Sequence, residues 1–246
     1  MRPPSALLLD FVGTLVLFKP DPQGAVRCLF EELAPLLNER DFGSFHGAYM
    51  RAYNKYLAIR RTQLVEVSND VWLQEACRAL DPAIELDKGL LERAITRYFT
   101  CFMRGLRPAP GARSTLHYLA RQKGYRLGLV SNFSYAPFLR ARLEGLGLSG
   151  FFEVLAISHE VGYRKPHPAI FRFALERLGC APEEALMVGD TPSEDVYGAR
   201  KLGMGACLVR SSLTDSYAAY EVDSAEASLL SPDLIIDQLS GLRALL

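Results

Sequence analysis

The sequence predicts an α/β protein whose parallel β-sheet is interrupted by an inserted bundle of helices. From Arg107 onward, short apolar runs alternate with segments of helical periodicity, a pattern typical of a parallel sheet with helices on both faces. Between residues 24 and 105, apolar side chains instead recur at helical spacing. One apolar run, at 6–9, precedes that helical region. The predicted bounds are 1–17 and 108–246 for the core, and 18–107 for the helical insertion.

Each element of the core follows from a local pattern. Strands are expected where short apolar runs lie between turn-forming residues, and helices where apolar residues recur at helical spacing. Pro168 begins one such helix, in the first turn, where proline is favoured. The predicted strands are 6–9, 126–130, 154–157, 185–188, 205–209 and 234–236. The predicted helices are 112–123, 137–146, 168–178 and 193–202, followed by a short helix at the end of the chain.

The helical region is expected to form a self-contained bundle of about four helices. A loop with two prolines, 16–22, separates it from the first strand, and breaks in the periodicity are expected at 38–43 and 81–82. Because the insertion follows the first strand directly, it is positioned to cover the carboxyl ends of the strands. Insertions of this kind act as lids that exclude water and select substrates.

Charge and hydropathy narrow the class of partner. Lys plus Arg and Asp plus Glu number 28 each, so no strong field favours nucleic acid or an anionic membrane surface. No apolar run approaches the roughly 18 residues that a membrane-spanning helix requires. We therefore expect a cytoplasmic protein that binds a small molecule.

The five cysteines are scattered, odd in number and without a C-x-x-C pair. This distribution argues against a disulfide framework and against a zinc site. Reduced thiols are the expectation for all of them. They are Cys28, Cys77, Cys101, Cys180 and Cys207.

Polar residues follow the first two strands of the predicted core. Asp10 ends the run 6–9, and Ser131-Asn132 follows the strand at 126–130. In an open parallel sheet, ligands bind beyond the carboxyl ends of the strands, so Asp10 is a candidate nucleophile or metal ligand. Taken alone, each of these stretches is better explained as a turn.

Further polar residues follow two later strands. Lys165 lies beyond the strand at 154–157, while Asp190 follows the strand at 185–188 and Asp195 begins the next helix. We expect Asp190 and Asp195 to converge on the side of the sheet where Asp10 lies. Three gathered carboxylates repel one another unless a cation is present. Oxygen ligands of this kind suit Mg²⁺, which also contacts substrate phosphate.

The order of these residues resembles the four motifs of the haloacid dehalogenase (HAD)-like hydrolase superfamily. The resemblance spans the α/β part from Ala6 to about Val209. It implies a Rossmann-like core with a helical cap inserted after the first motif. The segments that carry it are DFVGTL at 10–15, Ser131, GYRKPHPAIF at 162–171, and VGD at 188–190 with Asp195-Val196 and Gly198-Ala199.

The resemblance also implies a role for each matching residue. It makes Asp10 the nucleophile that forms an aspartyl-phosphate or aspartyl-ester, and Lys165 the group that stabilises this intermediate. Binding of the phosphoryl oxygens is assigned to Ser131, with Asn132 and Thr14. The implied cofactor is Mg²⁺, held by Asp10, Asp190, Asp195 and the carbonyl of Val12.

Val12 departs from the family pattern. Phosphatases of the family usually carry a second Asp two residues after the nucleophile, which protonates the leaving group and then activates water. Val12 cannot transfer a proton, and general acid-base assistance is typically worth ~10²–10⁴ in rate. We therefore expect a phosphohydrolase whose small phosphorylated substrate has a good leaving group, such as an acyl or aryl phosphate.

Other functions are consistent with the same residues. The family's metal-independent 2-haloacid dehalogenases also lack the second Asp, although Asp190 and Asp195 suit a metal better. Phosphonate cleavage through a lysine of the helical region is a weaker alternative, as is a catalytically weak phosphate-binding or regulatory member. The polar segment 211–231 has no assigned role, and the sequence does not specify the oligomeric state.

Overall fold

The computed structural model describes residues 3–37, 40–210 and 220–246, and the chain divides into two compact units. The α/β unit contains Met1–Leu17, Arg61–Glu66 and Arg107–Leu246, and the helical unit contains Phe18–Arg60 and Val67–Leu106. The predicted insertion, 18–107, differs from the helical unit because Arg61–Glu66 and Arg107 group with the α/β unit. Val65 pairs in antiparallel fashion with Tyr163, which is far from it in the sequence.

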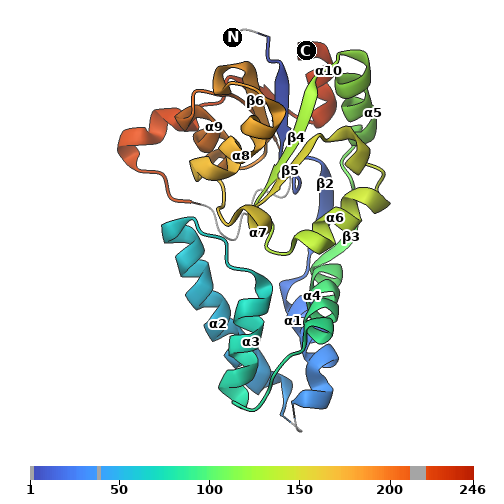
Figure 1. The fold of residues 1–246 in the computed structure, drawn as a ribbon, viewed down its shortest axis with the longest axis vertical. Helices are drawn as coiled ribbons and strands as arrows, with labels where there is room; N and C mark the ends of the chain where they lie inside the picture. The colour runs from blue at the N-terminus through green and yellow to red at the C-terminus, as the bar shows by residue number, and fades with distance from the viewer. Residues whose placement is uncertain (1–2, 38–39, 211–219) are drawn as a thin grey trace. The chain divides into compact units, whose positions relative to one another are not determined.

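Six strands of the described residues form a parallel sheet in the order β5-β4-β1-β6-β7-β8, so the predicted α/β class is confirmed (Figure 1). The strand β1 lies in the interior of the sheet, where Leu9 is in register with Leu129 of β4 and Val188 of β6. The strands are β1 (Ala6–Leu9), β4 (Arg126–Ser131), β5 (Val154–Ile157), β6 (Ala185–Gly189), β7 (Gly205–Val209) and β8 (Leu234–Ile236).

Helices cover both faces of this sheet. In Figure 1, α8 and α9 lie on one side of the strands and α5 and α10 on the other. Leu8 and Met187 point to the first side and pack in one core with Phe171 of α8. Leu7 and Leu9 alternate with Leu8 and are also fully buried, as expected for a strand with apolar neighbours on both faces. The helices are α5 (Ala112–His117), α6 (Ala136–Gly145), α7 (Ser158–Val161), α8 (Pro168–Leu178), α9 (Tyr197–Lys201) and α10 (Leu242–Leu245).

The helical unit packs around aromatic side chains. Trp72 and Tyr49 are almost fully buried, and the indole N–H of Trp72 donates to the Tyr49 hydroxyl (3.3 Å). The guanidinium of Arg60 lies over the Trp72 ring, 4.3 Å from its centroid. The helices are α1 (Pro22–Leu33), α2 (Phe42–Gln63), α3 (Asn69–Leu80) and α4 (Lys88–Phe102). The predicted break at 81–82 lies between α3 and α4, while residues 38–39 of the other break lie outside the described residues.

The expectation of a loop at 16–22 was wrong. Residues Val16–Pro20 form the strand β2, which pairs with β3 (Met103–Pro108) in a two-stranded sheet. Both strands end in proline, which cannot donate a ladder hydrogen bond and is tolerated at strand ends. Because the two strands are separated by the whole helical region, no local pattern indicated the pairing.

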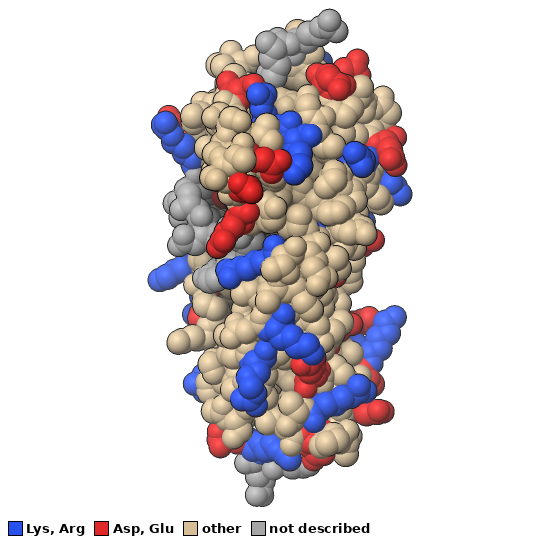
Figure 2. Space-filling model, turned by 90° about the vertical axis from the view of Figure 1, so that its left-hand side faces the viewer, with Lys and Arg blue, Asp and Glu red and all other residues tan. Residues whose placement is uncertain are grey.

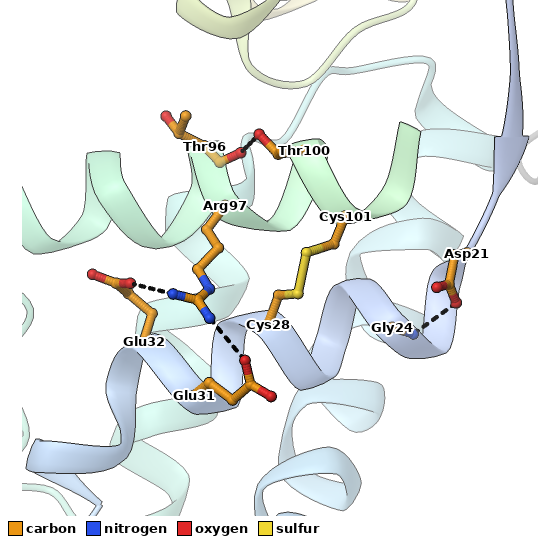
Figure 3. The surroundings of a disulfide bond; sticks show 9 residues. All are labelled: Asp21, Gly24, Cys28, Glu31, Glu32, Thr96, Arg97, Thr100 and Cys101. Atoms are coloured by element: carbon orange, nitrogen blue, oxygen red, sulfur yellow. Dashed lines mark hydrogen bonds and ion pairs between the residues drawn. A yellow bond between two sulfur atoms is a disulfide. The ribbon is translucent and has the colours of Figure 1, made fainter. Parts of the chain in front are cut away.

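A disulfide joins Cys28 of α1 to Cys101 of α4, so the expectation of reduced thiols was wrong for these two residues (Figure 3). Their Cα atoms lie 6.7 Å apart although 73 positions separate them in the sequence. Arg97 of α4 reinforces the same contact through ion pairs with Glu31 (2.8 Å) and Glu32 (3.5 Å) of α1. The packing of α1 against α4 brings the two thiols together, and scattered positions in the sequence do not reveal this.

Two further expectations concern hydropathy and the polar segment near the end of the chain. Among the residues that the structure describes, no helix has the length and apolar character needed to cross a bilayer. Of the polar segment 211–231, residues 211–219 lie outside the described residues, and Ser224–Leu230 form a 3₁₀ helix.

The disulfide should contribute strongly to the stability of the helical unit. Replacing Cys28→Ser should lower the free energy of unfolding by about 4 kcal/mol under oxidising conditions, because the cross-link closes a long loop in the unfolded chain. Urea unfolding with and without dithiothreitol measures the effect, which should vanish in the reductant. The matched control is Cys180→Ser, which changes a free thiol. Titration of five thiols in the unreduced, denatured protein would contradict the disulfide.

Candidate active site

Asp10 lies at the carboxyl end of β1, inside the sheet. Its backbone N–H donates to the carbonyl of Val188 in β6 (2.9 Å), which extends the strand pairing by one residue. The chain then turns at once, because the N–H groups of Leu15 and Val16 both donate to the carbonyl of Phe11 (2.9 and 3.0 Å). These hydrogen bonds hold the backbone at Asp10 in place. Asp10 is only 7% exposed.

Lys165 joins two of the predicted carboxylates. Its Nζ donates to Asp10 Oδ1 (2.5 Å) and to Asp195 Oδ1 (2.6 Å), and its side chain is only 1% exposed. Burial by itself would lower the pKa of Lys165, but the negative charges of Asp10, Asp195 and Glu194 outweigh burial and raise this pKa. The ammonium group therefore stays charged beside the nucleophile candidate.

Asp10, Asp190 and Asp195 form one buried carboxylate cluster, in which one oxygen of each lies within 4.8 Å of the others. Burial is the main cause that raises the pKa of Asp10 to about 7, against the opposing effect of Lys165. Burial, followed by the charges of Asp10 and Asp195, raises the pKa of Asp190 to about 8. The cluster thus holds more negative charge than Lys165 alone can balance.

Two glycines make room for these carboxylates. A Cβ on Gly13 would lie 1.9 Å from Asp190 Oδ2, and a Cβ on Gly189 would lie 2.2 Å from the carboxyl carbon of Asp195. Gly13 also has φ +79°, a backbone conformation that residues with a side chain rarely adopt. The close approach of the carboxylates therefore depends on glycine at both positions.

The predicted hydroxyl ligands are buried near the same strand ends. Ser131, the last residue of β4, is 2% exposed and Thr14 is 1% exposed. The hydroxyl of Thr14 has no hydrogen-bond partner within the described residues. A buried hydroxyl without a partner is unusual in a native protein, and it leaves Thr14 available to a bound oxygen atom.

Asn132 has protein partners on both sides of its amide. Its Oδ1 accepts from the Lys165 backbone N–H (2.6 Å), and its Nδ2 donates to the Lys165 carbonyl (3.0 Å) and to Glu194 Oε2 (2.9 Å). The side chain of Asn132, which was predicted to bind phosphate, therefore fixes the backbone of Lys165. Glu194, 5% exposed, is a site residue that the sequence analysis passed over, although it directly precedes Asp195.

Val12 lies in the turn between Asp10 and Gly13. Its side chain is half-buried, and its backbone forms a bridge with Val16. An apolar side chain at this position offers neither a proton nor an anionic ligand. Coordination of a metal by the Val12 carbonyl stays a prediction.

Comparison with known proteins finds a matching family model and several relatives. The family model of haloacid dehalogenase-like hydrolases matches residues 4–203. A glyceraldehyde 3-phosphate phosphatase of Methanothermobacter thermautotrophicus is 43% identical over 141 residues, which are 57% of this chain. The matched part spans only 59% of that enzyme's length.

Solved structures show similar folds over nearly the full length. A HAD phosphatase from Thermococcus onnurineus has a TM-score of 0.61 and 27% identity, covering 98% of this chain and 97% of the other. A 2-haloacid dehalogenase from Pseudomonas syringae pv. Tomato has a TM-score of 0.70 and 23% identity, covering 98% and 96%. At that identity the second similarity concerns the fold alone.

Gly13→Ala should destabilise the protein more than backbone strain alone explains. The left-handed conformation costs a non-glycine residue roughly 1–2 kcal/mol, and the contact with Asp190 should add to this cost. Gly124→Ala is the matched control, because Gly124 has φ +75° and an added Cβ would meet nothing within 4 Å. Chemical unfolding of both variants measures the difference.

A double variant separates the clash from the strain. Gly13→Ala combined with Asp190→Ala removes the oxygen that the new Cβ meets, so its free energy of unfolding should rise above that of Gly13→Ala alone. If Gly13→Ala and Gly124→Ala were equally destabilised, the packing of Asp190 against the turn would not constrain position 13.

Proposed function

Because the chain belongs to the haloacid dehalogenase-like hydrolase family, we propose that it is a Mg²⁺-dependent phosphohydrolase in which Asp10 is the nucleophile. The single observation that carries the proposal is the contact of Lys165 Nζ with both Asp10 and Asp195, inside the buried carboxylate cluster. The phosphatase activities of the relatives support it. The proposed substrate is a small phosphorylated molecule.

The donor set of the carboxylate cluster suits Mg²⁺. All its donors are carboxylate oxygens, which hard divalent cations prefer. Both Asp195 oxygens already accept hydrogen bonds, from Lys165 and from the Thr191 N–H (3.0 Å), so Asp10 and Asp190 are the proposed direct ligands, with Asp195 in support. The Val12 carbonyl is proposed as a further ligand. When bound, the cation would balance negative charge on the cluster and on the phosphoryl group.

The chain's own residues can carry out the transfer in two steps. An oxygen of Asp10 attacks phosphorus, the bond from phosphorus to the leaving oxygen breaks, and the leaving group departs with the electron pair. Lys165 holds the attacking carboxylate, and Thr14 and Ser131 are proposed to donate to the phosphoryl oxygens. Water then attacks phosphorus of the aspartyl-phosphate, the bond from phosphorus to the Asp10 oxygen breaks, and Asp10 is restored as the carboxylate. The phosphate departs as dihydrogen phosphate, which carries both protons of the attacking water.

Val12 limits which phosphates can react. Without a carboxylic acid at this position, the departing oxygen receives no proton from the turn. General acid catalysis of ~10²–10⁴ corresponds to roughly 3–5 kcal/mol of barrier. An acyl or aryl phosphate needs less of this assistance, because its leaving group is a weak base. We therefore propose such a substrate class rather than an alkyl phosphate.

The helical unit is proposed to serve as the cap that selects the substrate, as the family's pattern of insertion implies. Phosphonate cleavage through a Schiff base of this unit has little support, because such a lysine needs a lowered pKa. A hydrogen bond to Glu75 (2.7 Å) instead raises the pKa of Lys55. Lys19 is exposed, and Lys88 lies exposed near Glu92.

Two other readings of the site are less well supported. A metal-independent 2-haloacid dehalogenase is consistent with Val12, since halide leaves without a proton, but it gives no role to the carboxyl group of Asp190. A phosphate-binding regulatory protein has little need for a lysine placed 2.5 Å from Asp10 Oδ1.

The balanced surface charge supports a small molecule rather than nucleic acid as the partner. On the face in Figure 2, Lys and Arg side chains lie among Asp and Glu side chains. The cytoplasmic location stays a prediction. The Cys28–Cys101 disulfide weighs against it, because disulfides are rare in cytosolic proteins.

Val12→Asp should increase hydrolysis of alkyl phosphates. The new carboxyl group could protonate the leaving oxygen, so kcat/KM for an alkyl phosphate should rise by about 10²-fold, while that for acetyl phosphate or p-nitrophenyl phosphate should change far less. Steady-state kinetics with Mg²⁺ on the wild type, Val12→Asp and Asp10→Asn measure these effects.

The same panel includes 2-haloacids with and without a chelator. Wild-type activity on phosphates equal to that of Asp10→Asn would refute the proposed nucleophile. Turnover of a 2-haloacid that survives chelation would establish the dehalogenase instead.

Stability should depend on pH through Asp10 and Asp190. Their folded-state pKa values of about 7 and about 8 lie above the ordinary value of 3.8. At these two groups the metal-free folded protein therefore binds more protons than the unfolded chain between about pH 4 and pH 8, so their contribution to stability should fall as pH rises through this window. Mg²⁺ should raise the unfolding temperature more at pH 8 than at pH 5, because ligand carboxylates must lose their protons.

Thermal unfolding of Asp190→Asn tests the assignment of this effect. The variant should show a weaker pH dependence without metal and a smaller response to Mg²⁺. An equal response in wild type and variant would place the cation elsewhere.

A further inference from the structure

Residues 64–66, from the helical region of the sequence, form backbone hydrogen bonds with residues 162–164, which directly precede Lys165. Glu66 donates its N–H to the Gly162 carbonyl (2.9 Å), and Arg164 donates its N–H to the Leu64 carbonyl (2.8 Å). Leu64 has φ +55° and is the single non-glycine residue with a positive φ in the described part of the chain. Such a conformation persists only where the surroundings enforce it, so this short pairing is a fixed feature of the α/β unit.

The Glu66 carboxylate is buried within that pairing. Its side chain is 1% exposed, and Oε2 lies 2.6 Å from Nη1 of Arg164, whose side chain is 9% exposed. The same Oε2 accepts a hydrogen bond from the Ser158 hydroxyl. Burying a charged carboxylate costs free energy, which its hydrogen bonds and ion pair must offset. Arg164 directly precedes Lys165 in the chain.

Ser158 extends the contact to the other loop of the site. Its hydroxyl oxygen accepts from the Phe133 N–H (2.9 Å), and Phe133 follows Ser131 and Asn132. Asn132 in turn forms hydrogen bonds with the backbone N–H and the backbone carbonyl of Lys165. One carboxylate therefore links the loop after β4 with the loop after β5.

We propose that Glu66 is a positioning residue for Lys165 and Ser131. Its carboxylate fixes Arg164 on one side and Ser158 on the other, and thereby sets the positions of the Lys165 ammonium group, which contacts Asp10, and of Ser131 at the end of β4. The role in turnover rests on the proposed phosphohydrolase activity. Misplacing catalytic groups by about 1 Å can cost about 10²-fold in rate, which makes such support valuable.

Glu66→Gln tests the proposal with little change of shape. Hydrogen–deuterium exchange should be faster by at least about tenfold in the peptides that cover 162–167 and 132–135, because both loops lose the same carboxylate. With Mg²⁺ and p-nitrophenyl phosphate, kcat should fall by about 10²-fold, with a much smaller change in KM.

Glu160→Gln is the matched control. Glu160 lies in the same short helix as Ser158. It accepts two hydrogen bonds from Arg140 (2.9 and 2.7 Å), but the side chains of Glu160 and Arg140 are substantially exposed. This variant should keep the exchange rates and the kcat of the wild type. Equal exchange in Glu66→Gln and Glu160→Gln would overturn the proposal, even if the wild type hydrolysed no phosphate. Absence of wild-type turnover would instead refute the proposed function.

A double variant distinguishes positioning from the effect of an unbalanced buried charge. Glu66→Gln with Arg164→Gln removes both charges, so its unfolding temperature should recover relative to Glu66→Gln while kcat stays low. Recovery of kcat together with the unfolding temperature would show that Glu66 only neutralises Arg164, and would overturn the positioning role.

Discussion

The contact of Lys165 with Asp10 and Asp195 is the constraint on which the rest of the site depends. Three buried carboxylates face one ammonium group, so the fully ionised cluster carries two uncompensated negative charges. Protons partly cancel this excess in the folded chain, as the raised pKa values of Asp10 and Asp190 indicate. A bound divalent cation would cancel it without protons and would leave Asp10 ionised, which is the form that the proposed attack on phosphorus requires.

Much of the fold and of the carboxylate cluster could be predicted from the sequence. The strands of the sheet are short apolar runs, and parallel strands place their carboxyl ends at one edge. Asp10, Ser131 and Asp190 follow such runs directly, so their convergence required only the strand assignments. Lys165 lies in the loop region beyond β5, and Asp195 lies in the helical segment Pro192–Val196 after β6.

Other features depend on contacts that no local pattern encodes. The Cys28–Cys101 bond and the pairing of β2 with β3 join residues at opposite ends of the helical region. Glu66 is an ordinary acidic residue in the sequence, and only the pairing of Val65 with Tyr163 places it beside Arg164. Gly13 and Gly189 were visible as glycines, but the carboxylates that occupy the space of their missing side chains were not.

The raised pKa values do not supply the proton that Val12 cannot give. A protonated Asp10 is not a nucleophile, and Asp190 would lose its proton on binding a cation. Lys165 stays charged between two carboxylates, and giving up its proton would remove the charge that holds them together. None of these groups can therefore act as general acid without disabling the site. Under the proposed mechanism, the substrate must therefore supply a leaving group that departs as a weak base.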